Sequence, residues 1–257
     1  MAKPDSPVQI TGCIVTYNNA QIIGDTIEQI LRATAHLNFI LYVVDNRSSD
    51  GTVELIQERF PQVRMIRSPK NLGFGKGHNL ALPYLESDYH VIINPDIKLP
   101  EGAIEPLISY LERHAEVAMV TPKILNLDGT EQFLPKRRPR LRYLIGGRVG
   151  FLRKYREEYT RQHEQLDRPT EIDLCTGCFM LLRTSVFKQV GGFDPRYFMY
   201  FEDADLTREV QRFGKVIFNP EVSVYHAWER EDTRSLKLLW IHVLSMCRYI
   251  YKWHGTS

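Results

Sequence analysis

Two hydrophobic periods alternate along the first hundred residues. Consecutive apolar and β-branched residues at 8–17, 39–46, 63–68 and 89–96 are typical of buried strands. Between them, apolar residues recur at helical spacing in 20–34 and 48–60, and segment 71–87 begins as a glycine-rich loop and continues as a helix. This alternation predicts an α/β fold with a mostly parallel sheet that helices cover on both faces.

The second half of the chain has a less regular pattern. A helix is expected at 101–113 and a strand at 117–125, followed by a hairpin whose turn contains Asp128 and Gly129. The later segments predict, in order, a strand at 172–182, a short helix at 184–193, a helix at 203–214, one or two strands at 215–226 and a tail helix at 232–253.

Composition is that of an ordinary globular protein. The chain has 257 residues, and its formal net charge of only +2 does not favour a nucleic-acid partner. No signal peptide and no apolar run of the roughly 20 residues that a bilayer requires are evident, so we expect a cytoplasmic location. Cys175 and Cys178 form a CxxC pair without a second pair, and we interpret them as small residues of a buried strand rather than a redox or zinc site.

Basic residues concentrate in one segment. Residues 136–161 contain ten Arg or Lys and two Glu, which fits either a solvated insertion or a flap with an anion-binding face. Basic residues also occur among the apolar residues of the tail, at Arg234, Lys237, Arg248 and Lys252. That helix either packs on the core or contacts an anionic membrane surface.

Polar groups follow each predicted strand of the first half. They are Thr16-Tyr17-Asn18, Asp45-Asn46, the loop at 71–79, and Asn94-Pro95-Asp96. Because ligands of parallel α/β sheets bind beyond the carboxyl ends of the strands, we expect these groups to line one edge and form a site. The loop at 71–79 either holds phosphates through its backbone N–H groups or is simply a tight turn.

A strand-end carboxylate is a candidate metal ligand. Asp96 follows an apolar strand directly, and Mg²⁺ or Mn²⁺ is usually held by one or two carboxylates together with substrate phosphates. The alternative is an Asx-Pro turn. His226 ends another strand, and its imidazole could complete a metal shell that Asp96 begins.

Three acids fall within four residues, directly after an aromatic run. Glu202, Asp203 and Asp205 could complement the dipole at a helix N-terminus. Alternatively, Asp203 is a general base, because its acidic neighbours and its aromatic surroundings both raise a carboxyl pKa.

Taken in order, these segments resemble family 2 glycosyltransferases. The matching motifs cover about residues 8–253 and are "IVTYNN", "VVDNRSSDGT", "NLGFGKGHN", "INPDI", "CTGCFMLLR", "VGGFDPRYFMYFEDADL" and "VSVYHAW". Within the family, they are most similar to bacterial rhamnosyltransferases that build cell-surface polysaccharides. The resemblance implies a GT-A fold in a single domain, 1–257, with a nucleotide-sugar-binding half at about 8–98, an acceptor-binding half at about 99–230 and a C-terminal helix at about 231–257.

The resemblance also implies roles for particular residues. Asp203 matches the catalytic base, and Asp45 matches the position that accepts a hydrogen bond from the pyrimidine ring. Asn94 replaces the first acid of the family's DxD-like motif, which leaves Asp96 as the metal ligand, with His226 beside it. The expected substrate-binding residues are Thr16, Tyr17, Asn18, Asp45, Lys76, Asn94, Gly177, Glu202 and Arg208. The aromatic run at 197–201 is expected to form a sugar-stacking wall.

The implied reaction is inverting transfer of a sugar from a nucleoside diphosphate. dTDP-rhamnose is the preferred donor and a UDP-hexose the alternative, with a lipid-linked or glycan acceptor and Mg²⁺ or Mn²⁺ as cofactor. The enzyme would be cytoplasmic, with peripheral contact to an anionic inner membrane face. A dinucleotide-dependent oxidoreductase is the competing enzyme class, and the missing G-x-G-x-x-G motif argues against it. An anion-binding module that uses residues 136–161 would leave the acid cluster unexplained.

Overall fold

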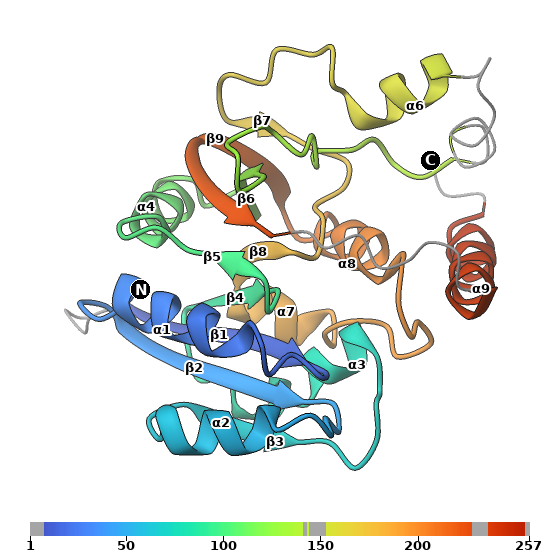
Figure 1. The fold of residues 1–257 in the computed structure, drawn as a ribbon. Helices are drawn as coiled ribbons and strands as arrows, with labels where there is room; N and C mark the ends of the chain where they lie inside the picture. The colour runs from blue at the N-terminus through green and yellow to red at the C-terminus, as the bar shows by residue number, and fades with distance from the viewer. Residues whose placement is uncertain (1–7, 141–142, 144–152, 228–235, 255–257) are drawn as a thin grey trace.

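A mixed sheet of nine strands forms the middle layer of the structure, a computed structural model that describes residues 8–140, 143, 153–227 and 236–254 (Figure 1). The strands are β1 (Gln9–Thr16), β2 (Asn38–Asp45), β3 (Arg64–Arg67), β4 (Tyr89–Ile93), β5 (Ile97–Lys98), β6 (Val117–Leu125), β7 (Thr170–Glu171), β8 (Phe179–Arg183) and β9 (Lys215–His226). Their order is β3-β2-β1-β4-β8-β6-β9-β5, and β7 pairs with β9.

The first half of the sheet is parallel, as predicted. β1 pairs in parallel with β2 and β4, and β2 with β3. The second half is mixed, because β8 runs antiparallel to both β4 and β6, whereas β6 and β9 are parallel. The apolar pattern could not reveal this direction, since a strand that is buried on both faces has the same pattern in either orientation.

Helices cover both faces of the sheet. They are α1 (Ile23–Ala33), α2 (Thr52–Arg59), α3 (Phe74–Asn79), α4 (Ile104–Arg113), α6 (Arg153–Thr160), α7 (Thr184–Gln189), α8 (Glu202–Val210) and α9 (Leu236–Lys252), with a 3₁₀ turn at Leu82–Tyr84. Successive residues of β1 enter different cores: Ile14 packs with α1, α2 and α4, whereas Cys13 and Val15 pack with α7 and α8. This alternation between two buried faces produces the three-layer fold.

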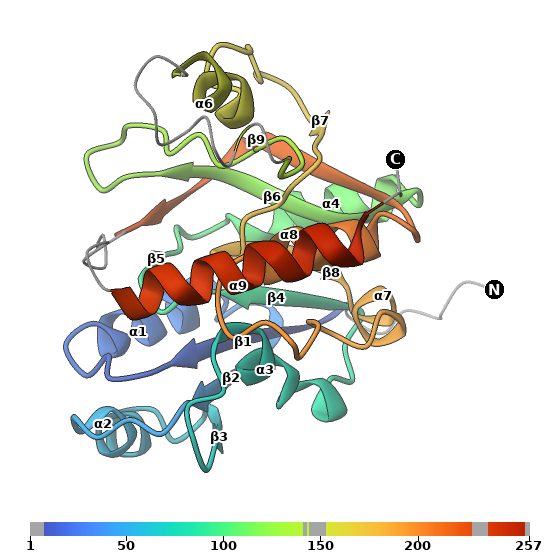
Figure 2. The ribbon, with the colours of Figure 1, turned by 90° about the vertical axis from the view of Figure 1, so that its right-hand side faces the viewer.

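Helix α9 lies across the outside of α8 (Figure 2). Tyr249 of α9 is buried in a third apolar cluster with Leu174, Tyr197, Phe201 and Ala204. The predicted tail helix is therefore present from residue 236, and residues 232–235 lie outside the described part. None of the helices in the described part of the chain has the length and apolar content needed to cross a membrane.

One local prediction was wrong. The strand expected at 172–182 begins only at Phe179, and Cys175 and Cys178 lie in the buried loop that precedes it. That loop is held from outside the sheet, because the Cys175 N–H donates to the Thr207 hydroxyl on α8. The predicted hairpin after β6 is confirmed as a short one: Leu125 and Glu131 form an antiparallel bridge, and the Asn126 N–H donates to the Thr130 carbonyl across the turn of Asp128 and Gly129.

Candidate functional site

The carboxyl ends of β1 and β2 meet at one edge of the sheet. Thr16 and Asp45 are paired in register, and the Asn46 N–H donates to the Thr16 carbonyl at 2.9 Å. Both side chains are buried. The Thr16 hydroxyl donates to Asn19 Oδ1, so that it fixes the turn that leads out of the strand.

The two loops beyond these strands are joined to each other. Asn18 has a positive φ of 53°, its N–H donates to the Ser48 hydroxyl, and its side-chain oxygen accepts the Ser49 N–H. Tyr17 is 48% exposed, which leaves its ring available for stacking. Asp45 accepts hydrogen bonds from the Arg47 and Ser48 N–H groups, and therefore shapes the second loop.

The glycine-rich loop is explained by close packing. Gly73 has a φ of 81°, and a Cβ at this position would lie 1.9 Å from the Phe198 carbonyl oxygen. The Phe74 N–H donates to that same carbonyl. A Cβ on Gly77 would meet Val15 at 2.7 Å. These contacts favour the tight-turn interpretation over the phosphate-binding one, and Lys76 is a half-buried residue of the short α3.

The ends of β4 and β9 bring Asn94, Asp96 and His226 together. The Nε2 atom of His226 lies 3.2 Å from Asp96 Oδ1 and 3.4 Å from Asn94 Nδ2. Asp96 Oδ1 is buried and has no hydrogen-bond donor. His226 Nδ1 lies 3.0 Å from Gln132 Oε1, a residue that the sequence did not point to.

The Gln132 amide assigns the tautomer of His226. Its nitrogen donates to the His226 carbonyl and to Asn126 Oδ1, so its oxygen must be the acceptor for His226 Nδ1–H. The Nε2 atom of a neutral ring can then accept a hydrogen bond from the Asn94 amide nitrogen at 3.4 Å, and it also faces the Asp96 carboxylate across 3.2 Å. Two acceptors at this distance require a proton or a cation between them. A carboxylate oxygen and an imidazole nitrogen suit a divalent metal such as Mn²⁺.

The protein supplies only part of a metal shell. No cluster of three or more His, Cys, Asp or Glu side chains suited to a metal occurs in the part of the chain that the structure describes. The remaining ligands of an ion held by Asp96 and His226 would have to be substrate oxygens or water, as is usual for Mg²⁺.

Asp203 is the second residue of α8 and is held by two backbone N–H groups. Ala204 N–H donates to Oδ1 at 2.8 Å and Gly177 N–H donates to Oδ2 at 3.3 Å. Burial raises the pKa of Asp203 above its ordinary value, whereas the Lys136 cation and the two N–H donors lower it. A Cβ on Gly177 would lie 3.1 Å from the Phe74 ring, which explains why this tight position suits glycine.

Glu202 and Asp203 are neighbours with different environments. Burial, and then the charge of Asp203, raises the pKa of Glu202 to about 8. Glu202 Oε2 is buried without a hydrogen-bond partner, whereas both oxygens of Asp203 accept hydrogen bonds. Asp203 therefore ionises first, and Glu202 keeps its proton at neutral pH.

The third acid of the cluster, Asp205, is bound by residues at the C-terminal end of the chain. Asp205 is 1% exposed; its Oδ2 accepts from Lys252 Nζ at 2.8 Å and its Oδ1 from the Trp253 indole N–H at 2.8 Å. Arg208 stacks on the Trp253 ring, 4.2 Å from its centroid. Both residues thus attach α9 to α8, on a side of the helix that differs from that of Asp203.

The prediction that the aromatic run forms a sugar-stacking wall is wrong for two of its four residues, Tyr197 and Phe201. Tyr197 and Phe201 are buried in the cluster under α9, where Phe201 contacts His242 and Tyr249. Tyr200 and Phe201 both have positive φ values, 69° and 65°, directly before the acid cluster. Bulky residues rarely adopt this conformation, so the packing under α9 must hold the strained turn that presents Asp203.

The described part of the basic segment lies against the site. Lys136 pairs with Leu174 in an isolated bridge, and its ammonium lies 6.0 Å from the Tyr159 ring centroid on α6. The charge of Asp203, after burial, raises the pKa of Tyr159. Lys136 and Tyr159 are therefore neighbours of Asp203 that the sequence did not single out. Residues 141–142 and 144–152 of the segment lie outside the described part.

The two halves of the site are connected through adjacent residues. The carbonyl of Cys178 accepts the Asn94 N–H at 2.9 Å, and its neighbour Gly177 donates to Asp203. Burial raises the pKa of the Cys178 thiol to about 12, with further increases from the charges of Asp96 and Asp203. The cysteine therefore lies between the two carboxylates as a neutral thiol.

Comparison with solved structures shows the fold class. The mannosyltransferase PcManGT from Pyrobaculum calidifontis, in complex with GDP-Man and Mn²⁺, matches with a TM-score of 0.62 at 18% identity, over 89% of this chain and 59% of that one. S. aureus TarS 1–349 in complex with UDP-GlcNAc matches with a TM-score of 0.64 at 14% identity, over 94% and 66% of the two chains. The chain has the GT-A fold of glycosyltransferases.

Sequence comparison identifies the family. Residues 12–191 match glycosyl transferase family 2, and the chain belongs to this family. It is 30% identical over 251 residues to rhamnosyltransferase WbbL of Escherichia coli, which covers 92% of this chain and 90% of that protein. It is 29% identical over 231 residues to N-acetylglucosaminyl-diphospho-decaprenol L-rhamnosyltransferase of Mycobacterium tuberculosis, which covers 82% and 74%. The chain is thus a glycosyltransferase, and these relatives are rhamnosyltransferases.

Proposed function

We propose that this glycosyltransferase moves L-rhamnose from dTDP-rhamnose to a lipid-linked or glycan acceptor in bacterial cell-surface polysaccharide synthesis. The names of the two curated relatives support the sugar, and the name of the mycobacterial one supports an acceptor built on a lipid diphosphate. The observation that carries the reaction type is the environment of Asp203, a buried carboxyl that accepts two backbone N–H hydrogen bonds and whose pKa burial raises, beside Glu202, whose pKa burial raises to about 8.

Asp203 is the general base of this proposal. It accepts the proton of the acceptor hydroxyl while the hydroxyl oxygen attacks the anomeric carbon of the donor. The bond from that carbon to the diphosphate breaks, and the anomeric configuration inverts because attack and departure are on opposite faces. A positioned base typically contributes about 10²–10⁴-fold to the rate of such a step.

The nucleotide binds, in this proposal, at the edge formed by β1 and β2. The Tyr17 ring is exposed, and the loops of Asn18 and Asp45 are fixed to each other by hydrogen bonds through Ser48 and Ser49. A carboxylate offers about four lone-pair sites, so Asp45 can hold its loop and still accept a pyrimidine N–H. Lys76 on α3 would face the phosphates of the donor.

Asp96 and His226 would hold Mg²⁺ or Mn²⁺, with Asn94 beside them. His226 Nε2 lies 3.2 Å from Asp96 Oδ1, and that buried oxygen accepts no hydrogen bond, so both atoms fit a cation. When bound, the ion would neutralise the negative charge that develops on the departing diphosphate. Gln132 then has a positioning role, since it directs the His226 lone pair toward Asp96.

Helix α9 would place the enzyme on an anionic membrane surface. Its outward positions include the exposed Leu236, Trp240, Leu244 and Tyr251, which recur at helical spacing, and none of its residues is acidic. The helix also packs on the core through Tyr249, so the proposed membrane contact would use its opposite, exposed face. An apolar face with basic neighbours suits the interface of an anionic inner leaflet.

Liposome flotation tests the membrane contact. Protein that floats with phosphatidylglycerol vesicles and loses flotation in Trp240→Ser supports it, with Phe213→Ser, an exposed aromatic residue outside α9, as the matched control. Absence of flotation with every lipid composition would reject it.

A donor and acceptor screen tests the reaction. Purified enzyme is incubated with dTDP-rhamnose, UDP-glucose or UDP-N-acetylglucosamine, together with a short-chain alkyl diphosphate that carries one N-acetylglucosamine. Rhamnosylated product, absent with Asp203→Asn, is the expected result. Transfer from a UDP-hexose alone would replace the donor in this proposal, and transfer from none of the donors would reject the proposed reaction with this acceptor.

A further inference from the structure

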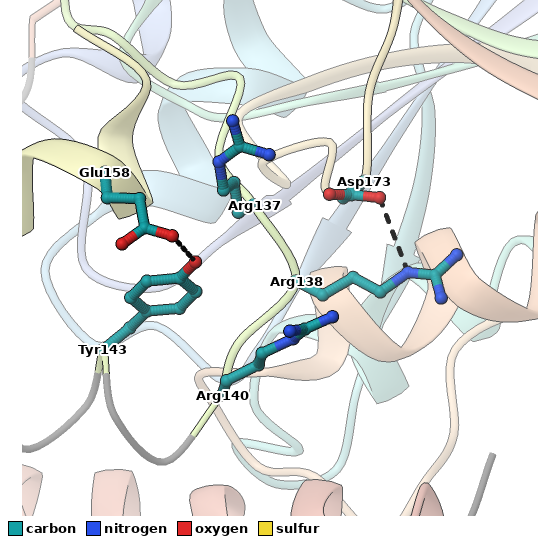
Figure 3. A pocket seen from close by; sticks show the side chains of 6 residues that line it. All are labelled: Arg137, Arg138, Arg140, Tyr143, Glu158 and Asp173. Atoms are coloured by element: carbon teal, nitrogen blue, oxygen red, sulfur yellow. Dashed lines mark hydrogen bonds and ion pairs between the residues drawn. The ribbon is translucent and has the colours of Figure 1, made fainter. Parts of the chain in front are cut away.

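A polar cavity of about 270 Å³ lies between the basic segment, α6 and the loop before β8 (Figure 3). It is lined by Arg137, Arg138, Arg140, Tyr143, Glu158 and Asp173, which places three guanidinium groups against two carboxylates. We call it the arginine pocket. Five of its six residues lie in the basic segment 136–161, which the sequence offered as a candidate anion-binding face, and none contributes to the steps proposed above.

The arginines of the pocket have donors that are not used. The buried Nε atoms of Arg137 and Arg138 have no hydrogen-bond partner. Arg138 Nε is 3.6 Å from Asp173 Oδ1, which is an ion pair but too long for a hydrogen bond. Arg140 is exposed, and within the described residues its side chain has neither a hydrogen-bond nor an ion-pair partner. Because a buried donor without an acceptor is unfavourable, a ligand with anionic oxygens would be stabilised here.

The acidic groups of the pocket leave room for such a ligand. The Tyr143 hydroxyl donates to Glu158 Oε1 at 2.6 Å, and Figure 3 shows this pair on the α6 side, apart from Arg138 and Arg140. Figure 3 also shows the side chains of Arg138 and Arg140 leaving the segment in the same direction. Two guanidinium forks on one side match the oxygens of a phosphate, which they can hold with paired hydrogen bonds.

Two backbone segments lead from this pocket to Asp203. Lys136, whose charge acts on Asp203, is bonded directly to Arg137. On the other side, Asp173 of the pocket lies four positions before Gly177, whose N–H donates to Asp203. The distance from Asp203 to the pocket follows from helix α8. Arg138 donates to the side-chain oxygen of Gln211, which comes eight residues after Asp203. At the rise of a helix, eight residues span about 12 Å.

We propose that the arginine pocket binds a phosphate group of the acceptor, so that the acceptor lies with its hydroxyl at Asp203 and its phosphate on Arg138 and Arg140. This inference rests on the proposed function for the identity of the acceptor. The spacing suits a sugar unit that carries a phosphate or diphosphate at its far end. The pocket would thereby select phosphorylated acceptors over neutral glycans with the same sugar.

Equilibrium binding tests the pocket without any transfer reaction. The probes are the N-acetylglucosaminyl alkyl diphosphate described above and the alkyl N-acetylglucosaminide that lacks phosphate, each measured with dTDP in excess to occupy the donor site. The diphosphate probe should bind at least about tenfold more tightly than the neutral probe, as expected for hydrogen bonds to charged groups. Arg140→Gln should remove this difference, and Arg140→Lys should keep part of it.

Arg113→Gln is the matched control, because Arg113 is an exposed arginine on α4 whose one hydrogen bond within the described residues goes to the Ser109 carbonyl of its own helix. It should bind both probes as the parent does. Equal binding of the diphosphate probe by the parent and Arg140→Gln would overturn the inference. Because no donor sugar is present in this assay, its outcome is independent of whether rhamnose is transferred.

Two further experiments test whether the pocket instead binds a lipid headgroup or free phosphate. Arg140→Gln should float with phosphatidylglycerol vesicles as the parent does, and inorganic phosphate should bind the parent far more weakly than the diphosphate probe does. Loss of flotation with unchanged binding of the probe would assign the pocket to a bilayer headgroup instead. Equally tight binding of inorganic phosphate, abolished by Arg140→Gln, would assign it to free phosphate. Either result overturns the acceptor assignment.

Discussion

The backbone N–H of Gly177 donates to Oδ2 of Asp203 at 3.3 Å, across 26 positions of the sequence. The next residue along the chain, Cys178, accepts the N–H of Asn94 at 2.9 Å. One short loop therefore fixes the proposed base relative to the strand end that carries Asp96. The predictions below test the two sides of this connection and the packing that supports it.

Asp203 should be the only acid of its cluster that is indispensable to chemistry. Asp203→Asn keeps the shape but cannot accept a proton, so kcat should fall about 10²–10⁴-fold while the affinity for the nucleotide sugar is kept. Glu202→Gln should retain turnover, because Glu202 is already protonated at neutral pH. Steady-state kinetics and donor-binding calorimetry on the same samples measure both quantities. Near-normal turnover of Asp203→Asn would refute the assignment.

Lys136 should control the acid limb of the pH–rate profile. Its cation lowers the pKa of Asp203, so Lys136→Met should raise that pKa and move the acid limb of kcat/KM to higher pH. Lys136→Arg keeps the charge and should leave the limb near its original position. An unchanged profile in Lys136→Met would show that the ammonium does not act on the base.

Activity should depend on a divalent cation. Excess EDTA should abolish transfer, Mn²⁺ or Mg²⁺ should restore it, and Asp96→Ala should behave like the chelated enzyme at any ion concentration. Gln132→Leu should raise the Mn²⁺ concentration required by about 10–100-fold, because the His226 ring loses the partner that orients it. Binding of Mn²⁺ can also be followed directly by electron paramagnetic resonance. Full activity in EDTA would instead indicate that cationic side chains stabilise the diphosphate.

Lys252 should be a main anchor of α9. Its ammonium contacts Asp194, Asp205 and Glu209 at 3.1, 2.8 and 3.0 Å, and Asp205 is buried. Lys252→Met leaves the Asp205 charge uncompensated, which should lower the free energy of unfolding by about 3–5 kcal/mol. Lys237→Met, an exposed position of the same helix, should change it by less than about 0.5 kcal/mol in urea unfolding. Equal stability of the two variants would contradict this role.

The stability contribution of Glu202 should decrease with rising pH. Its folded-state pKa of about 8 exceeds the ordinary value of 4.5, so the protonated side chain favours folding fully below about pH 4.5 and this advantage is lost as pH rises to about 8. Glu202→Gln removes the dependence. Relative to the parent, the variant should therefore gain stability between pH 5 and pH 8, by about 1.4 kcal/mol per pH unit at most.

Urea unfolding at several pH values measures this effect. Glu101→Gln, whose parent side chain is 70% exposed, is the control and should follow the parent at every pH. Parallel curves for Glu202→Gln and the parent would show that the carboxyl is not held neutral in the folded protein.

Much of the fold could be predicted from local patterns. Consecutive apolar residues identified β1, β2, β3 and β4, and their parallel arrangement placed Thr16, Asp45 and Asn94 at one edge of the sheet. Those inferences succeed because strand and helix periods are properties of neighbouring residues, and because a parallel sheet brings all its strand ends to the same side. The order of motifs was sufficient for the family, since each motif lies within a single turn or strand end.

The partners of the site residues required the tertiary structure. Gln132 meets His226 across 94 positions and Lys252 meets Asp205 across 47, and no periodicity connects residues that far apart. Tyr197 and Phe201 look like any other exposed aromatic run until α9 covers them. Local sequence determines which backbone conformations are favourable, whereas burial and electrostatic partners depend on which distant segments pack together. The charge states of Asp203 and Glu202, and with them the proposed chemistry, depend on this packing of distant segments.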